Sequence, residues 1–148
     1  MIWTPAQQKR LEKELELLHI YFPSFKPRYL FQQILLEGWM TTNLKNRYLI
    51  RLYVPADMPN SIPEVVITYP GSLTDYHGKK LSDYQQDMHM HLLKPRDGFP
   101  SLCTFKPSHW HPNLTFYNVL IKARMWLEAY EGHRISGKPI DYYLKHQY

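Results

Sequence analysis

The order of the hydrophobic patterns along the chain restricts its fold more than any other sequence feature. One helical pattern comes first, strand-like runs follow, and a second helical pattern comes near the end. The strand-like runs are residues 28–37, 47–54 and 64–69, with a shorter run at 89–93. The sequence shows neither a βαβ repeat nor a Gly-rich phosphate loop. This order predicts an α+β fold: an N-terminal helix, a four-stranded antiparallel meander sheet, and C-terminal helices packed on one face.

The first helix carries both a start signal and a stop signal. Thr4 and Gln7 have the spacing of a capping box, and Pro5 stands at the first helical position. An apolar stripe follows at spacings of four and three, formed by Leu11, Leu15 and Leu18. Pro23 is expected to end the helix, because proline cannot continue the hydrogen-bond ladder.

The second helix is expected to start near Asn113 or Thr115 and to stop at Gly132. One of its faces is apolar and comprises Leu120, Ala123, Leu127 and Tyr130. A further short helix is expected after Pro139, so the C-terminal part of the chain is predicted to be mainly helical.

Three connections between these elements have their own signals. Gly38 and residues 41–43 are expected to form the turn between the first two strands. Pro59 and Pro63 lie four residues apart, and each proline pushes its predecessor toward extended geometry. We therefore expect a stiff, extended crossover before the strand at 64–69. The segment 94–110 is rich in proline and is expected to be irregular.

Length and composition indicate one domain covering residues 1–148. No run approaches the roughly 18 apolar residues of a membrane span. The N-terminus lacks a basic segment followed by an apolar run, and a single cysteine forms no internal disulfide, so we expect a cytoplasmic protein. Residues 89–148 carry 8 Lys+Arg against 4 Asp+Glu, which suits an acidic partner or nucleic acid. Because the sequence has no dense basic run, we interpret this bias as a solvated face and do not expect nucleic-acid binding.

Cys103 is the only cysteine and the leading candidate for chemistry. It stands in the segment expected to be irregular, and loops carry reactive groups more often than cores do. Lys94, Arg96, Lys106 and several histidines are near it in sequence, and positive charge stabilises the thiolate that attacks carbonyl carbons. The alternative is that Cys103 is a small buried hydrophobic residue.

The histidines form two His-x-His pairs, His89 with His91 and His109 with His111. On a strand, alternate residues share a face, so each pair has the spacing to hold one metal ion, with Cys103 as a further zinc ligand. Either pair can equally straddle a loop and point nowhere in common. We therefore predict no metal site and no cofactor.

Several motifs occur in the order found in ubiquitin-conjugating enzymes, and together they span nearly the whole chain. Met58-Pro59 and Ile62-Pro63-Glu64-Val65 resemble the family's proline turn, Tyr-Pro-x-x-Pro-Pro followed by Lys-Val-x-Phe. The later matches are His91, Leu102-Cys103, Trp110-His111-Pro112, Trp126-Leu127-Glu128-Ala129-Tyr130-Glu131 and Gly137-Lys138-Pro139. The chain is most similar to the divergent bacterial branch. That branch includes standalone proteins encoded beside cGAS-like (cyclic-GMP-AMP-synthase-like) nucleotidyltransferases in CBASS antiphage operons.

The resemblance implies the fold and the transferase activity of ubiquitin-conjugating enzymes. Cys103 would accept a protein C-terminus as a thioester, and an amine, usually that of a lysine, would then attack the carbonyl carbon. The implied acyl donor is the cGAS-like nucleotidyltransferase. The other implied partners are a lysine-bearing acceptor protein and, as a further candidate, an activating enzyme. The implied setting is bacterial antiviral defence, with no membrane.

The chain departs from the family where the oxyanion donor is expected. Eukaryotic members carry His-Pro-Asn before the cysteine, and the Asn stabilises the oxyanion. Here the corresponding segment is Met90-His91-Leu92-Leu93, in which His91 lies twelve residues before Cys103. His91 is therefore our candidate for the oxyanion donor or for a base.

In related conjugating enzymes the first helix contacts the activating enzyme. Here Lys9, Arg10 and Lys13 give this helix a basic edge, which we expect to dock the donor protein. Two other functions remain open at this point. One is a non-catalytic binding module of the same fold, and the other is a zinc-dependent enzyme that uses the His-x-His pairs.

Overall fold

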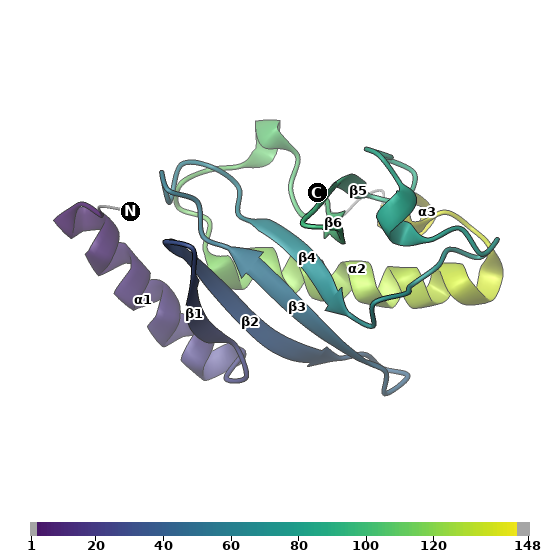
Figure 1. The fold of residues 1–148 in the computed structure, drawn as a ribbon, viewed down its shortest axis with the longest axis horizontal. Helices are drawn as coiled ribbons and strands as arrows, with labels where there is room; N and C mark the ends of the chain where they lie inside the picture. The colour runs from purple at the N-terminus through teal and green to yellow at the C-terminus, as the bar shows by residue number, and fades with distance from the viewer. Residues whose placement is uncertain (1–2, 145–148) are drawn as a thin grey trace.

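The chain forms a six-stranded antiparallel sheet, seen in a computed structural model that describes residues 3–144 (Figure 1). The strands are β1 (Lys26–Leu30), β2 (Gln33–Thr41), β3 (Arg47–Tyr53), β4 (Glu64–Tyr69), β5 (Leu92–Arg96) and β6 (Phe99–Leu102), in the spatial order β1-β2-β3-β4-β6-β5. The helices are α1 (Pro5–Tyr21), α2 (Phe116–Ser136) and α3 (Ile140–Leu144), with 3₁₀ turns η1 (Leu81–Asp83) and η2 (Pro107–His109). The α+β class is confirmed, whereas the prediction of four strands is wrong.

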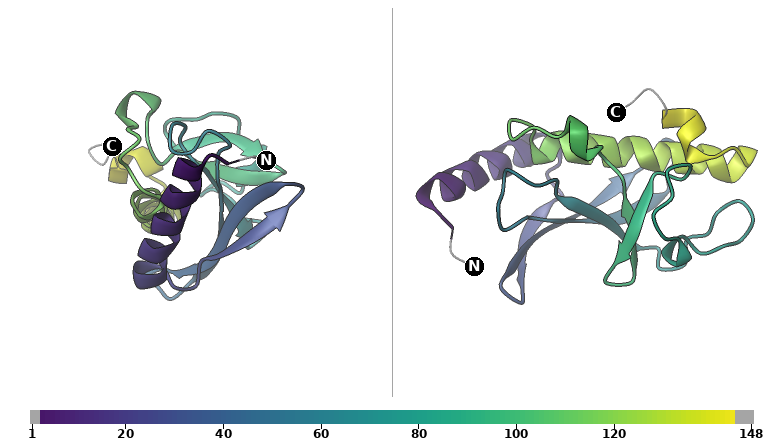
Figure 2. Two further views of the ribbon diagram at one scale, coloured as in Figure 1. Left: turned by 90° about the vertical axis from the view of Figure 1, so that its left-hand side faces the viewer. Right: turned by 90° about the horizontal axis from the view of Figure 1, so that it is seen from above.

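Helices α1 and α2 lie on the same face of the sheet. The right-hand view of Figure 2 shows them as one layer above the strands. The core between the layers includes Leu18 of α1, Ile50 of β3 and Trp126 of α2, each at most 1% exposed. Burying one aliphatic side chain such as Leu18 or Ile50 contributes about 1.5–3 kcal/mol to folding. The opposite face carries a much smaller buried cluster of Leu35, Tyr53 and Val66, with Phe99 packed against it.

Both long helices begin at the predicted caps. Thr4 and Gln7 form the capping box of α1, and Thr115 forms the corresponding box of α2 with Asn118. The predicted stop at Gly132 is wrong, because α2 continues to Ser136. Gly132 instead gives room for Tyr143 of α3, whose ring would lie 2.9 Å from a Cβ at position 132. The helix ends at Gly137, whose φ of +78° is the left-handed conformation that glycine favours.

The predicted strand at 28–37 is two strands. Phe31 and Gln32 both have positive φ values, 49° and 63°, and form the tight turn that reverses the chain between β1 and β2. Gly38 was predicted to lie in a turn, but it lies within β2 opposite Ile50. Phe25 lies directly over it, since a Cβ at position 38 would be 2.5 Å from the Phe25 ring. The absence of a side chain there lets the connection from α1 pack onto the sheet.

The segment expected to be irregular contains a β-hairpin. Residues 92–96 and 99–102 pair as β5 and β6, joined by Asp97 and Gly98 with φ values of 53° and 80°. The short strand predicted at 89–93 therefore begins later, at Leu92. Strand β6 also pairs with β4, through Val65 with Leu102, so the hairpin extends the sheet.

The proline crossover at 54–63 folds into two successive turns rather than an extended segment. The side-chain amide of Gln7, which also caps α1, donates to the carbonyl oxygens of Ala56 and Met58 at 2.9 and 3.0 Å. The Trp110 indole N–H donates to the carbonyl oxygen of Pro59 at 3.1 Å. The crossover is thus tied both to α1 and to the segment that follows Cys103.

Candidate functional site

Cys103 is the first residue after strand β6, at the start of the irregular segment that leads to η2, as predicted. Its backbone N–H donates to the carbonyl oxygen of His91 at 2.9 Å. The side chain is only 7% exposed, and the thiol Sγ lies 3.9 Å from the carbonyl oxygen of Phe105. The structure therefore brings the two predicted catalytic residues next to each other through the backbone.

His91 occupies the last position of the turn that precedes β5, with a positive φ of 48°. Its side chain is 2% exposed, and its ring Nε2 lies 2.7 Å from Oδ1 of Asp141. The backbone N–H of Asp141 donates to the carbonyl oxygen of His89 at 2.8 Å. Helix α3 is thus docked on this turn by two bonds from one residue, and Asp141 orients the His91 ring.

Trp126 joins the same turn to the core. Its indole N–H is shared between the carbonyl oxygens of Met90 and His91, at 3.1 Å each. Its ring stacks on Tyr130 with a centroid distance of 5.3 Å and an angle of 9° between the planes. The His91 carbonyl therefore accepts from both Trp126 and Cys103, which fixes the relative positions of these three residues.

Burial raises the pKa of the Cys103 thiol above its ordinary value, and the positive charge of Lys106 opposes this with a smaller effect. The prediction that the surroundings stabilise the thiolate is therefore wrong in sign. Of the other expected cations, Arg96 is directed elsewhere. Its guanidinium lies 3.8 Å from the Tyr53 ring centroid and 3.4 Å from a carboxylate oxygen of Glu64. A raised pKa means that a smaller fraction of this thiol is ionised at neutral pH than in an ordinary cysteine.

The bond to Asp141 decides which chemistry His91 can do. A carboxylate accepts hydrogen bonds, so the proton of a neutral His91 ring resides on Nε2 and the lone pair on Nδ1. In this tautomer the Nε2 proton is donated to Asp141, so Nε2 is not available as an oxyanion donor.

The His-x-His pairs do not form a metal centre in the described part of the chain, residues 3–144, which holds no group of three or more metal-ligating side chains. His89 is exposed in the turn, while His91 is buried against Asp141. His109 lies in η2, and His111 uses its Nδ1 to accept from the backbone N–H of Asn113 at 3.1 Å. The two members of each pair therefore have different surroundings.

The predicted basic edge of α1 is only partly available to a partner. Lys9 and Lys13 are exposed. Arg10 instead pairs with the buried Glu14 at 3.1 Å and donates to the carbonyl oxygen of Leu114 at 2.9 Å. The Glu14 carboxylate also accepts the first backbone N–H of α2 at 3.0 Å. Arg10 thus holds α1 against α2, and its role in partner binding stays a prediction together with Lys9 and Lys13.

Sequence reasoning missed Asp141 and the hydrogen bonds of Trp126. Trp126 was visible as part of a motif, but nothing in its neighbours indicates that its indole N–H reaches the turn before β5. Asp141 lies in a segment whose pattern indicates only a short helix. Its role depends on where α3 docks.

Comparison of the chain with protein-family models, curated proteins and solved structures found no match. Within residues 3–144, none of the helices combines the length and the apolar character needed to cross a membrane. The interpretation of the site therefore rests on its own geometry.

Proposed function

We propose that this protein is a cysteine-dependent acyl transferase similar to ubiquitin-conjugating enzymes, with Cys103 as the acyl carrier. The supporting observation is the position of the only thiol in the chain. Cys103 directly follows strand β6, and its backbone N–H donates to the carbonyl oxygen of His91, whose ring contacts Asp141. The backbone thus brings a thiol and a histidine with a carboxylate partner close together, and these are residue types that act in acyl transfer.

The proposed reaction consists of two thioester steps without any redox change. In the first, Cys103 Sγ forms a bond to the carbonyl carbon of a protein C-terminus held as a thioester on an activating enzyme. The bond to the enzyme's sulfur breaks, and that sulfur takes up the proton lost by Cys103. In the second, a lysine amine attacks the carbonyl carbon, the C–S bond breaks, and Cys103 regains a proton from the amine. His91 accepts and returns the proton of the thiol.

The fold supports the proposal in outline. Strands β1 to β4 form a four-stranded antiparallel meander that follows α1 and precedes α2 along the chain. This is the arrangement expected of a ubiquitin-conjugating enzyme. The β5–β6 hairpin extends this meander and carries Cys103 at its end. The proposed donor is a cGAS-like nucleotidyltransferase, the acceptor is a lysine-bearing protein, and the proposed compartment is the cytoplasm.

The burial of Cys103 favours a second candidate, a non-catalytic binding module of the same fold. A thiol that is 7% exposed and has a raised pKa is a weak nucleophile at neutral pH. In this case Cys103 would serve only as a small apolar residue at the end of β6.

The test is to look for the thioester directly. Tagged wild-type protein and the variants Cys103→Ala and Cys103→Ser are purified from the native host under non-reducing conditions. We expect a wild-type adduct that dithiothreitol removes, no adduct with alanine, and a dithiothreitol-resistant ester with serine. Mass spectrometry should find a partner's C-terminal residue linked to the Cys103 peptide. An adduct that persists in Cys103→Ala, or no adduct at all, would exclude the transferase and favour the binding module.

A further inference from the structure

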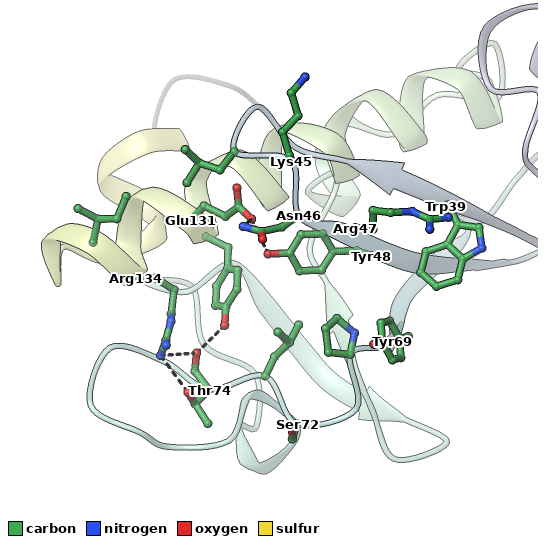
Figure 3. A pocket seen from close by; sticks show the side chains of 15 residues that line it. Trp39, Lys45, Asn46, Arg47, Tyr48, Tyr69, Ser72, Thr74, Glu131 and Arg134 are labelled. Carbon is green, nitrogen blue, oxygen red and sulfur yellow. Dashed lines mark hydrogen bonds between the residues drawn. The ribbon is translucent and has the colours of Figure 1, made fainter.

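A second candidate site lies far from Cys103, at the other end of strand β4. A cavity of about 680 Å³ opens between the β2–β3 turn, the segment 70–74 and the C-terminal part of α2 (Figure 3). Strand β4 begins beside Leu102, next to Cys103, and ends at Tyr69, which lines the cavity. Cavities of roughly 300–1,000 Å³ are typical of ligand sites.

The cavity has an apolar and aromatic rim. Trp39 and Tyr69 pack edge to face with ring centroids 5.7 Å apart, and the Arg47 guanidinium lies 4.4 Å from the Trp39 ring centroid. Leu44 and Ile135 also line the cavity, and all four apolar side chains are exposed. Exposed apolar side chains that gather around one concavity are a feature of interaction sites.

Three cations surround this rim without a carboxylate partner. Within residues 3–144, no ion pair involves Lys45, Arg47 or Arg134, although all three line the cavity. Arg134 is fixed by hydrogen bonds to the Thr74 hydroxyl at 2.9 Å and the Asp75 carbonyl oxygen at 2.8 Å, both neutral acceptors. The site therefore presents positive charge that an anionic group can neutralise.

The wall formed by α2 contains a buried carboxylate with an unmet acceptor. Glu131 is 5% exposed, and its Oε2 accepts from the Tyr48 hydroxyl at 2.7 Å and the Asn46 amide at 2.8 Å. Its Oε1 is buried and has no hydrogen-bond partner in the described part of the chain. Because the Glu131 side chain lines the cavity, a shift of the atoms that cover Oε1 would let a ligand there supply the missing N–H donor.

We infer that this cavity binds a peptide segment of a partner protein that carries acidic side chains beside an aromatic or aliphatic one. A peptide supplies carboxylates for the three cations, an apolar side chain for the Trp39–Tyr69 rim, and backbone N–H donors for Glu131. An inorganic anion has no donor for Glu131. A sugar-phosphate backbone also lacks N–H donors. The inference is independent of the chemistry at Cys103.

The experiment is a selection from a random heptapeptide library on the immobilised full chain, with counter-selection on the uncoated support. The selected peptides are then labelled, and their affinities are measured by fluorescence anisotropy. We expect them to contain Asp or Glu next to an aromatic or aliphatic residue. Their affinity should fall at least about tenfold in Lys45→Glu/Arg47→Glu and should weaken as salt rises.

The matched control is Lys26→Glu/Lys94→Glu, which makes the same charge change at two exposed lysines that do not line the cavity and should leave affinity within about twofold. Ile135→Glu, at a residue that is 73% exposed, gives a second test that is safe for folding and should also weaken binding. Equal binding to the cavity variants and the control, or no acidic selected peptides, would overturn the inference. So would binding of a single-stranded DNA 20-mer that is lost in Lys45→Glu/Arg47→Glu while no peptide binds.

Discussion

Alkylation of Cys103 as a function of pH tests the central electrostatic feature of the site. Burial raises the pKa of this thiol, and only the charge of Lys106 opposes that effect. An ordinary cysteine has a pKa of about 8.5, so about 3% of it is thiolate at pH 7. Cys103 should have a smaller thiolate fraction than this, and iodoacetamide reacts with the thiolate. We therefore expect the folded protein at pH 7 to react at less than about one-thirtieth of its limiting rate at high pH.

The shape of the rate profile is as informative as its size. While the thiol is mostly protonated, the rate should rise about tenfold for each pH unit and should still be rising above pH 8.5. The same protein in urea should level off near the ordinary pKa. Lys106→Gln should slow the reaction further, because it removes the charge that favours the thiolate. Lys94→Gln is the matched control and should leave the profile unchanged.

Mass spectrometry of timed samples measures these rates, and Cys103→Ala gives the background. The reasoning is refuted if the folded protein reaches its plateau below pH 8.5, since the thiol pKa would then be lowered and not raised. It is also refuted if the two lysine variants respond equally, because the effect would then come from net charge and not from the position of Lys106.

Three further substitutions test how the fold is held and where a partner docks. For Asp75, burial raises the pKa, but the hydrogen bonds it accepts from a tyrosine hydroxyl and two backbone N–H groups bring it below the ordinary value. Ionised Asp75 therefore stabilises the folded state above about pH 3.9, and this stabilisation is lost as pH falls further. Asp75→Asn should lower the free energy of unfolding, measured in urea, by about 1–3 kcal/mol at pH 7 and by less at pH 3. An equal loss at the two pH values would contradict this. Gly38→Ala should lower the free energy of unfolding by about 1–3 kcal/mol, and with it the thermal midpoint, because the new Cβ would lie 2.5 Å from the packed Phe25 ring. Gly71→Ala is the control and should not change the thermal midpoint, because no atom lies within 4 Å of its Cβ. Lys9→Glu/Lys13→Glu should slow association with the acyl donor at low salt and leave stability unchanged, and salt-independent, undiminished binding would place the contact elsewhere.

The elements that sequence reasoning located correctly are those whose signals are local. The capping boxes at Thr4 and Thr115 lie within four residues of the helices that they start. The β5–β6 hairpin was missed although Asp97-Gly98 is a strong two-residue turn signal. Pro95 and Pro100 outweighed it, because proline within a run argues against a strand. In the structure both prolines lie where the β5–β6 register is irregular, at the end of the hairpin that β4 does not pair with.

The hairpin also explains how much of the site could have been predicted. In its register Leu92 pairs with Leu102, so His91 and Cys103, the next residues outward, come side by side. The one-residue shift between Leu93 and Arg96 sets this register, and no sequence signal reports it. Asp141 was beyond prediction for a different reason. Its position depends on how α3 packs on α2, which is decided by tertiary contacts and not by local pattern.

A raised thiol pKa is compatible with acyl transfer because thiolate basicity has two opposite consequences. Each unit of pKa reduces the thiolate fraction tenfold at neutral pH, but the thiolate that forms is about threefold more nucleophilic. A more basic thiolate also leaves more slowly, so a thioester on Cys103 persists longer before an amine arrives. Burial therefore makes the first step depend on a base that removes the proton.

His91 is our candidate for that base: its carbonyl oxygen accepts the Cys103 backbone N–H, and its ring Nε2 contacts Asp141. If His91 is the base, His91→Ala should slow loading from an activated donor by roughly a hundredfold at pH 7, the scale of general-base catalysis. The deficit should shrink as pH rises, because the thiol then ionises without help. Single-turnover loading assays from pH 6 to pH 10 measure this. A deficit that is constant with pH would show that His91 only shapes the turn. If neither protein loads at any pH, Cys103 is a structural residue and the binding module is the better account.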